Sequence, residues 1–149
     1  IITEPNYLLL LLLATAVYLY YVKKNSKKAW LLALSTLATG IIVKILKVVI
    51  ARPRPLNTLI ETTIASFPSG HATVITFFLG ILIYLFSKKS SRKKSLLIAI
   101  PIILTVAFTR IYLRVHYLTD VLGGIILGSL ILMLLIYLDK NQNLFRHLP

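Results

Sequence analysis

The sequence predicts an all-α integral membrane helical bundle with five transmembrane helices, or six in a longer chain. Hydrophobic residues make up 58% of the 149 residues, and the mean hydropathy is +0.87. Only 14% of the residues are charged, whereas a typical soluble domain has about 25%. The hydrophobic residues form five runs rich in Leu and Ile, without the alternation of a β-barrel. We expect a single transmembrane domain over residues 1–149.

Each run is long enough to cross a bilayer as a helix, alone or with its flanks. The runs cover residues 7–22, 29–51, 72–86, 96–113 and 121–138. A hydrocarbon core of about 30 Å needs about 20 helical residues, with about 17 the lower limit. The second, fourth and fifth runs reach this range alone, whereas the first and third need flanking residues such as Pro5, Asn6 and those around Gly70. The chain begins at Ile1 rather than a methionine, so a helix before it is the six-helix alternative.

The basic residues predict the orientation of these helices. The sequence has 17 Lys and Arg against 4 Asp and Glu. Eleven basic residues fall after the first run, after the third run and in the C-terminal tail: Lys23, Lys24, Lys27, Lys28, Lys88, Lys89, Arg92, Lys93, Lys94, Lys140 and Arg146. Five crossings place these segments on one side, which the positive-inside rule makes cytoplasmic. We expect a multi-pass protein of the cell membrane without a secretory signal peptide, and not a nucleic-acid-binding protein.

The other basic residues belong to polar clusters on the opposite side, where ionisable groups are functional candidates. In the first cluster, Lys47 and Arg54 are seven residues apart, which is close to two helical turns. Pro53 and Pro55 interrupt a helix there, so a shared stripe is approximate. Three further cations on this side are Lys44, Arg52 and Arg114. The preferred interpretation is that their side chains extend to the lipid headgroups, and the alternative is that they bind a second phosphate.

The second cluster is Pro68-Ser69-Gly70-His71 at the start of the third run. Proline suits the first turn of a helix, and glycine allows close approach of the backbone to a ligand. The amides and the positive dipole end of such a helix form an anion site. The alternative is a helix start that binds no ligand.

The third cluster contains Thr109, Arg110, His116 and Asp120. His116 and Asp120 are four residues apart and can meet on one helical turn, or across a helix start with Thr119 as its N-cap. A carboxylate bound to one imidazole nitrogen leaves the other free to attack or to exchange a proton. Six residues turn a helix by about 600°, so the fourth helix must end between Arg110 and His116. The alternative interpretation of His116 and Asp120 is a hydrogen bond that serves only the structure.

In order and internal spacing, the clusters Lys47-x6-Arg54-Pro55, Pro68-Ser-Gly-His71 and Thr109-Arg110-x5-His116-x3-Asp120 resemble the three signature motifs of the type 2 phosphatidic acid phosphatase superfamily. Members are integral-membrane lipid phosphatases, including polyprenyl-diphosphate phosphatases. Thr109 replaces the serine that usually opens the third motif, and Leu118 stands where many members have proline. Integral-membrane members usually have six helices, with the first motif ending the third helix. Here it ends the second.

The resemblance implies a metal-independent phosphatase without a cofactor. It implies that His116 is the nucleophile that forms a phosphohistidine, that Asp120 orients His116, and that His71 protonates the leaving oxygen. The implied phosphate-binding residues are Lys47, Arg54, Ser69, Gly70 and Arg110. A metal site is not expected, because the four acidic residues Glu4, Glu61, Asp120 and Asp139 are scattered along the chain and cysteine is absent.

A site at the membrane boundary favours a phosphorylated lipid as substrate, with membrane lipids as the surroundings. Because the site is expected on the extracytoplasmic face, the first hypothesis is hydrolysis of a polyprenyl diphosphate, of undecaprenyl or dolichyl type, to the monophosphate. The alternative substrates are phosphatidylglycerophosphate and phosphatidate. An alternative of another class is a small anion or lipid transporter, which would carry polar residues near the bilayer midplane. Gly124 and Gly128 form either a dimer contact or, preferably, a close contact within the bundle.

Overall fold

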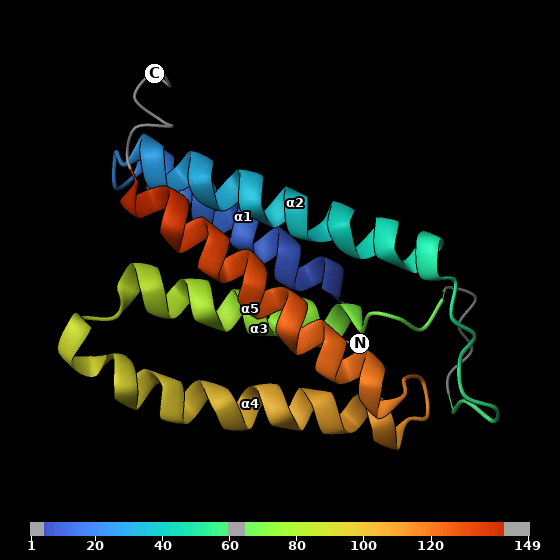
Figure 1. Cartoon of the computed structure of the whole chain (residues 1–149). Coiled ribbons are helices and arrows are strands. Elements are labelled where there is room, and N and C mark those ends of the chain that lie inside the picture. Colours follow the sequence, from blue (N-terminus) through green and yellow to red (C-terminus); the bar gives the residue numbers. More distant parts are fainter. Residues whose placement is uncertain (1–4, 60–64, 142–149) are drawn as a thin grey trace.

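A computed structural model describes residues 5–59 and 65–141 of the chain, and their regular structure is helical (Figure 1). The elements are α1 (Pro5–Tyr21), α2 (Ser26–Ile50), α3 (Gly70–Phe86), a 3₁₀ turn (Lys89–Ser91), α4 (Arg92–Tyr112) and α5 (Leu118–Lys140). Three helical segments are long and apolar enough to span a membrane: Ser26–Ile50, Lys89–Tyr112 and Leu118–Lys140. Helices α1 and α3 have 17 residues each. The prediction of an all-α membrane bundle is confirmed.

Local chemistry explains where the helices begin and end. The Asn25 side chain accepts a hydrogen bond from Lys28 N and caps α2, and Ala51 ends α2 in the left-handed region with a φ of 44°. This end precedes Pro53, as the proline spacing predicts. Helix α4 ends at Tyr112, so the predicted break before His116 is confirmed.

The alternative in which Thr119 caps α5 is wrong. Helix α5 begins at Leu118 with Tyr117 as its N-cap residue. The Tyr117 amide donates to Asp120 Oδ2 at 2.9 Å, an arrangement in which an acidic residue in the first turn satisfies an otherwise unpaired amide. Thr119 therefore lies inside the first turn of the helix.

The connections between helices collect at two ends of the bundle (Figure 1). The segment from α2 to α3 and the segment from α4 to α5 lie at one end, which we call the site end. The α1–α2 and α3–α4 connections and the C-terminus of α5 lie at the other end, which we call the lysine-rich end. The three polar clusters and the lysine-rich connections are thus separated by the length of the helices.

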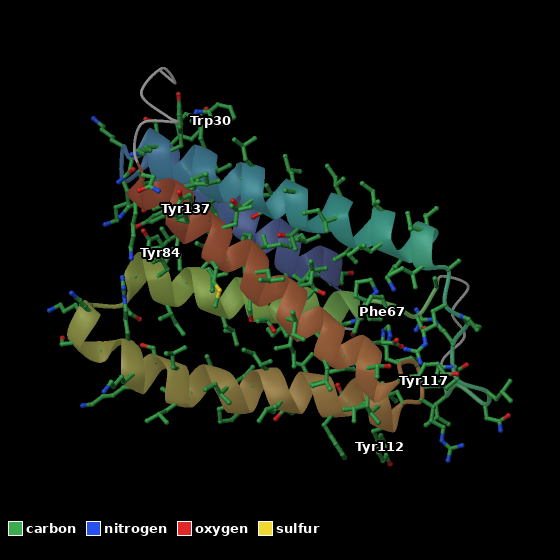
Figure 2. All side chains as sticks on the ribbon, viewed as in Figure 1. Trp30, Phe67, Tyr84, Tyr112, Tyr117 and Tyr137 are labelled. Carbon is green, nitrogen blue, oxygen red and sulfur yellow. The ribbon has the colours of Figure 1, made fainter. Side chains whose placement is uncertain are left out.

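The interior of the bundle is apolar, and large apolar side chains also cover its outside. Leu12, Leu32, Phe77, Ile81 and Leu135 are buried between α1, α2, α3 and α5, whereas many Leu, Ile and Val side chains on all the long helices are exposed. Figure 2 shows labelled aromatic side chains towards both ends, with Tyr112 and Tyr117 at the site end and Tyr84 and Tyr137 towards the lysine-rich end. Aromatic residues at both boundaries of an apolar band are typical of membrane proteins.

Two glycines bring α5 against the start of α3. A Cβ at Gly124 would lie 2.7 Å from Ser69 O, and a Cβ at Gly128 would lie 2.5 Å from Thr73 O. Only glycine permits this approach. The preferred interpretation of these glycines, a contact within the bundle, is confirmed. Because α3 occupies this side of α5, these glycines serve a contact within the chain, and an oligomer through Gly124 and Gly128 stays an untested prediction.

Candidate active site

The three polar clusters of the sequence meet at the site end. Ser69, at the start of α3, donates its amide to Asp120 O in α5 at 3.0 Å. Arg54, after α2, donates to Val115 O, next to His116, at 2.6 Å. Residues from five separate segments therefore surround one region. Lys47 and Asp120, for example, are 73 positions apart in the sequence.

Asp120 and His116 form a buried pair at the centre of this region. The Asp120 side chain has no exposed surface, and His116 is 5% exposed. His116 Nδ1 lies 3.6 Å from Asp120 Oδ2, which is an ion-pair distance but longer than a hydrogen bond. Nδ1 has no hydrogen-bond partner among the described residues. A small rotation of the imidazole would bring Nδ1 to the carboxylate and leave Nε2 directed elsewhere.

The surroundings of His116 favour its neutral form. His116 lies in the loop between α4 and α5, outside the helices. Burial is the largest effect that lowers the pKa of His116, and the charges of Arg54 and Lys47 lower it further, to about 4. The Asp120 charge and a backbone hydrogen bond with Ser66 oppose this shift. Burial also lowers the pKa of Arg54, while the Asp120 charge raises it.

The cations Lys47 and Arg54 each donate to a backbone carbonyl of another segment. Lys47, in the last turn of α2, donates its Nζ to Ala65 O at 2.6 Å. Arg54 donates to Val115 O. Both side chains are about half-buried. These bonds hold both side chains at the site end, where Lys and Arg are suited to bind an anionic ligand.

A second histidine pairs with the remaining cation. Arg110 Nη1, in the last turn of α4, lies 3.1 Å from Nε2 of His71, in the first turn of α3. A guanidinium nitrogen can only donate, so His71 Nε2 is the acceptor here. Arg110 Nε also donates to Thr109 Oγ1 at 3.3 Å. Thr109 thus keeps the hydroxyl of the serine that usually opens the third motif.

Ser69 and Gly70 form the buried turn from which α3 begins. Both residues are buried, and Ser69 Oγ accepts from Ala72 N at 3.5 Å. The contact of Gly124 with Ser69 O holds this turn against α5. The first turn of α3 therefore points its positive dipole end towards the region of Asp120 and His116.

Together these side chains can bind and transfer a phosphoryl group. Three cations and a helix start provide positive charge, one imidazole is oriented beside a carboxylate, and a second imidazole lies within the same cluster. Within residues 5–59 and 65–141, no group of three His, Cys, Asp or Glu residues is placed to hold a metal ion.

Comparison with known proteins identifies this arrangement. The sequence profile of the PAP2 superfamily matches residues 28–144, which include all three clusters. The chain belongs to the PAP2 superfamily. The resemblance seen in the sequence is therefore confirmed.

Two relatives within the PAP2 superfamily are informative. Phosphatidylglycerophosphatase B of Bacillus subtilis (strain 168) is 37% identical over 131 residues, covering 80% of this chain. This chain spans 64% of the length of that protein. The crystal structure of a transmembrane PAP2 type phosphatidylglycerolphosphate phosphatase from Bacillus subtilis superposes with a TM-score of 0.84 at 30% identity, and the match covers 97% of this chain and 74% of that one.

Two further residues of this PAP2 site were not predicted as part of it. Arg52 contacts Asp120 Oδ1 at 2.8 Å, so the prediction that its side chain extends to the headgroups is wrong. Ser66 is fully buried, and its amide and hydroxyl both donate to Arg52 O. The sequence could have assigned Arg52 to the site. A residue before proline is extended, and two such residues two positions apart, Arg52 and Arg54, direct their side chains to the same side. Nothing in the sequence indicates the role of Ser66.

Proposed function

We propose that this PAP2 protein is a membrane lipid phosphatase that works through a phosphohistidine intermediate and requires no metal. One observation carries the proposal: His116 lies beside the buried Asp120 within a cluster that also contains His71 and the cations Lys47, Arg54 and Arg110. Phosphoryl transfer depends mainly on positioning and on stabilisation of charge. Three cations can supply the charge that Mg²⁺ supplies elsewhere.

In the first step, Nε2 of His116 attacks the phosphorus atom while Asp120 stabilises the positive charge that develops on the imidazole. The bond from phosphorus to the lipid oxygen breaks, and His71 gives that oxygen a proton. In the structure His71 Nε2 accepts a hydrogen bond from Arg110 and carries no proton. When substrate binds, its phosphate oxygens would draw Arg110 towards themselves, and Nε2 of His71 would take up a proton from the solvent or from the substrate phosphate before the transfer.

In the second step, water attacks the phosphohistidine. His71 takes a proton from this water, the bond from phosphorus to Nε2 breaks, and inorganic phosphate leaves. His116 and His71 then have their starting protonation states. Lys47, Arg54 and Arg110 bind the phosphate oxygens in both steps, together with Ser69 and Gly70 at the start of α3.

The proposed substrate is phosphatidylglycerophosphate. Both relatives described above are named for action on this lipid. The sequence-based preference for a polyprenyl diphosphate rested on the expected extracytoplasmic position of the site, with mild support from Lys44, Arg52 and Arg114 as a second phosphate site. That support is weakened because Arg52 pairs with Asp120. The polyprenyl diphosphate remains the second candidate, supported by the proposed extracytoplasmic position of the site.

The test of this proposal is phosphate release by the purified protein in detergent with excess chelator. Phosphatidylglycerophosphate should be hydrolysed, and faster than polyprenyl diphosphate or phosphatidate. His116→Ala should lower the rate by about 10³-fold or more, because the covalent route is lost. The matched control is Arg114→Gln, a change at an exposed residue near His116, which should retain activity. Full activity of His116→Ala, or activity that disappears with chelator, would contradict the proposal.

The site end is proposed to face away from the cytoplasm, since the lysine-rich end should face it. The chain lacks cysteine, so single cysteines can report the orientation. Leu56→Cys lies at the site end and Ser90→Cys at the lysine-rich end, and both positions are exposed. A membrane-impermeant maleimide should label Leu56→Cys in intact cells and Ser90→Cys only after lysis. The reverse pattern would invert the proposed orientation.

A transporter receives no support from the arrangement of polar residues. The described cations of the three clusters gather at one end of the bundle rather than at the middle of the helices. Metal-free phosphate release by a detergent-solubilised protein would distinguish the enzyme from a transporter, because transport needs two compartments.

A further inference from the structure

Arg52 joins the segment after α2 to the start of α5 through three contacts. Its Nη1 donates to Asp120 Oδ1 at 2.8 Å and to Thr119 Oγ1 at 2.6 Å. Its guanidinium carbon lies 4.2 Å from the centre of the Tyr117 ring, within the range of a cation–π contact. Asp120 is 68 positions away in the sequence. These contacts reach the N-cap residue of α5 and two residues of its first turn.

The two oxygens of Asp120 therefore have different partners. Oδ1 accepts from Arg52, whereas Oδ2 accepts from the Tyr117 amide at 2.9 Å and faces His116 Nδ1 at 3.6 Å. Asp120 is fully buried, so the loss of one partner would leave a buried carboxylate oxygen without compensation. Arg52 on one oxygen and the Tyr117 amide on the other accompany the rotation in which Oδ2 faces His116.

The backbone of Arg52 is fixed as well. Its carbonyl accepts hydrogen bonds from the Ser66 amide at 2.9 Å and the Ser66 hydroxyl at 3.2 Å. Pro53 restricts Arg52 to an extended backbone, which places its side chain on the same side as that of Arg54. The backbone of Arg52 is thus bonded to the segment that precedes α3, and the described contacts of its guanidinium are with residues at the start of α5.

We propose that Arg52 is a positioning residue: it fixes the rotation of the Asp120 carboxylate so that Oδ2 stays opposite His116 Nδ1. This inference rests on the proposed role of His116 as nucleophile. Arg52 does not bind the transferred phosphate. That function belongs to Lys47, Arg54 and Arg110, and the loss of Arg52 should therefore affect turnover rather than substrate affinity.

The ion pair between Arg52 and Asp120 predicts a shift in the titration of His116. The charged and titratable groups around His116 are Lys47 from α2, Arg54 from the following segment, His71 from α3 and Asp120 from α5. Arg52 partly neutralises Asp120. Removing the Arg52 cation leaves the full carboxylate charge to stabilise the imidazolium, so the pKa of His116 should rise. The shift tests whether the charge of Arg52 acts on His116 through Asp120, and the kinetic variants test the positioning.

The kinetic test compares Arg52→Gln and Arg52→Lys with Arg114→Gln on phosphatidylglycerophosphate in detergent. Arg52→Gln should lower kcat by about 10- to 100-fold with KM changed by less than about threefold. The acid limb of kcat/KM should move to higher pH. Arg52→Lys should recover part of kcat, because an ammonium can reach one carboxylate oxygen but cannot reproduce the planar guanidinium contacts. Arg52→Gln in an Asp120→Asn background should cause little further loss.

The second test does not need activity. In protein with ¹⁵N-labelled histidine, an NMR titration assigned with His116→Gln should show the pKa of His116 about half a unit or more higher in Arg52→Gln than in the wild type. An unchanged pKa, a raised KM with normal kcat, or normal kinetics in Arg52→Gln would each overturn the inference. A wild-type protein that releases no phosphate would instead overturn the proposed function, and the NMR titration would still decide whether Arg52 sets the state of His116.

Discussion

The two ends of the bundle hold their charged residues in different ways. At the lysine-rich end, Lys23, Lys24, Lys88 and Lys89 are exposed. At the site end, Lys47, Arg52, Arg54 and Arg110 each contact a defined group on another segment. Exposed lysines suit attraction to a charged membrane surface, whereas half-buried cations held by carbonyls and imidazoles suit binding of an anion.

The acidic residues of the two ends show the same contrast. Asp120 is buried beside His116 and Arg52. Asp139, at the other end of α5, accepts a hydrogen bond from the Tyr84 hydroxyl, and Arg92 lies over the Tyr84 ring. Both described histidines belong to the site end. A site is therefore distinguished by which groups surround a carboxylate, and not by the number of charges nearby.

Among variants that compare the two ends, the largest effect should come from removing the charge of the acid at the site end. Asp120→Asn should keep the fold and lower kcat by about 10²-fold or more, because the imidazole loses the charge that orients it. Asp139→Asn is the matched control on the same helix and should change kcat by less than about twofold. Phosphate release from lipid substrate measures both. Equal losses in the two variants would remove the distinction between the ends.

The next largest effect concerns the leaving oxygen. His71→Ala should lower hydrolysis of phosphatidylglycerophosphate by about 10²-fold but hydrolysis of 4-nitrophenyl phosphate much less, because an acidic leaving group needs little help from a proton donor. Rates on both substrates should be measured with the same preparation. The same loss on both would contradict the role of His71 as the acid.

A smaller effect should follow from separating α3 and α5 at the site end. Gly124→Ala places a methyl group 2.7 Å from Ser69 O, so the turn before His71 must move, and we expect about a tenfold loss of activity and a lower melting temperature. Gly40→Ala is the control, since its Cβ would lie 3.5 Å from Leu9 Cδ1, an ordinary contact. If both variants behave alike, the α3–α5 contact does not position the site.

The buried histidine should also make stability depend on pH. The pKa of His116 is lowered from its ordinary value of about 6.5 to about 4 by burial and by the Arg54 and Lys47 charges. The unfolded chain therefore binds a proton that the folded chain excludes, and the free energy of unfolding should fall by roughly 1 to 2 kcal/mol from pH 7 to pH 5. The difference in thermal unfolding between wild type and His116→Gln isolates this contribution. A difference that does not change with pH would contradict it.

The smallest effect should come from the exposed lysines. Lys88→Ser combined with Lys89→Ser should leave kcat and KM within about twofold in detergent, because surface charges remote from a site contribute little. Kinetics at low and high salt measure this. A loss comparable to that of Asp120→Asn would show that the lysine-rich end takes part in the reaction.

The sequence predicted the helices and the convergence of the three clusters, since hydropathy, proline spacing and the number of crossings are local or additive properties. It did not predict the partner of Arg52. A long side chain next to a membrane has two favourable choices, a headgroup or a buried carboxylate, and the choice depends on where α5 begins. One of the two sequence-based alternatives made Thr119 the N-cap, whereas the structure has Tyr117 there, with its amide bonded to Asp120.

The most direct test of the site is to identify the residue that becomes phosphorylated. Wild-type protein is mixed with ³²P-labelled phosphatidylglycerophosphate, quenched in alkali to preserve phosphohistidine, and digested for mass analysis. The label should map to His116 and be absent from His116→Ala. A label on His71 or on a hydroxyl residue, or rapid turnover by His116→Ala, would contradict the proposal that the site end forms a histidine-centred phosphatase.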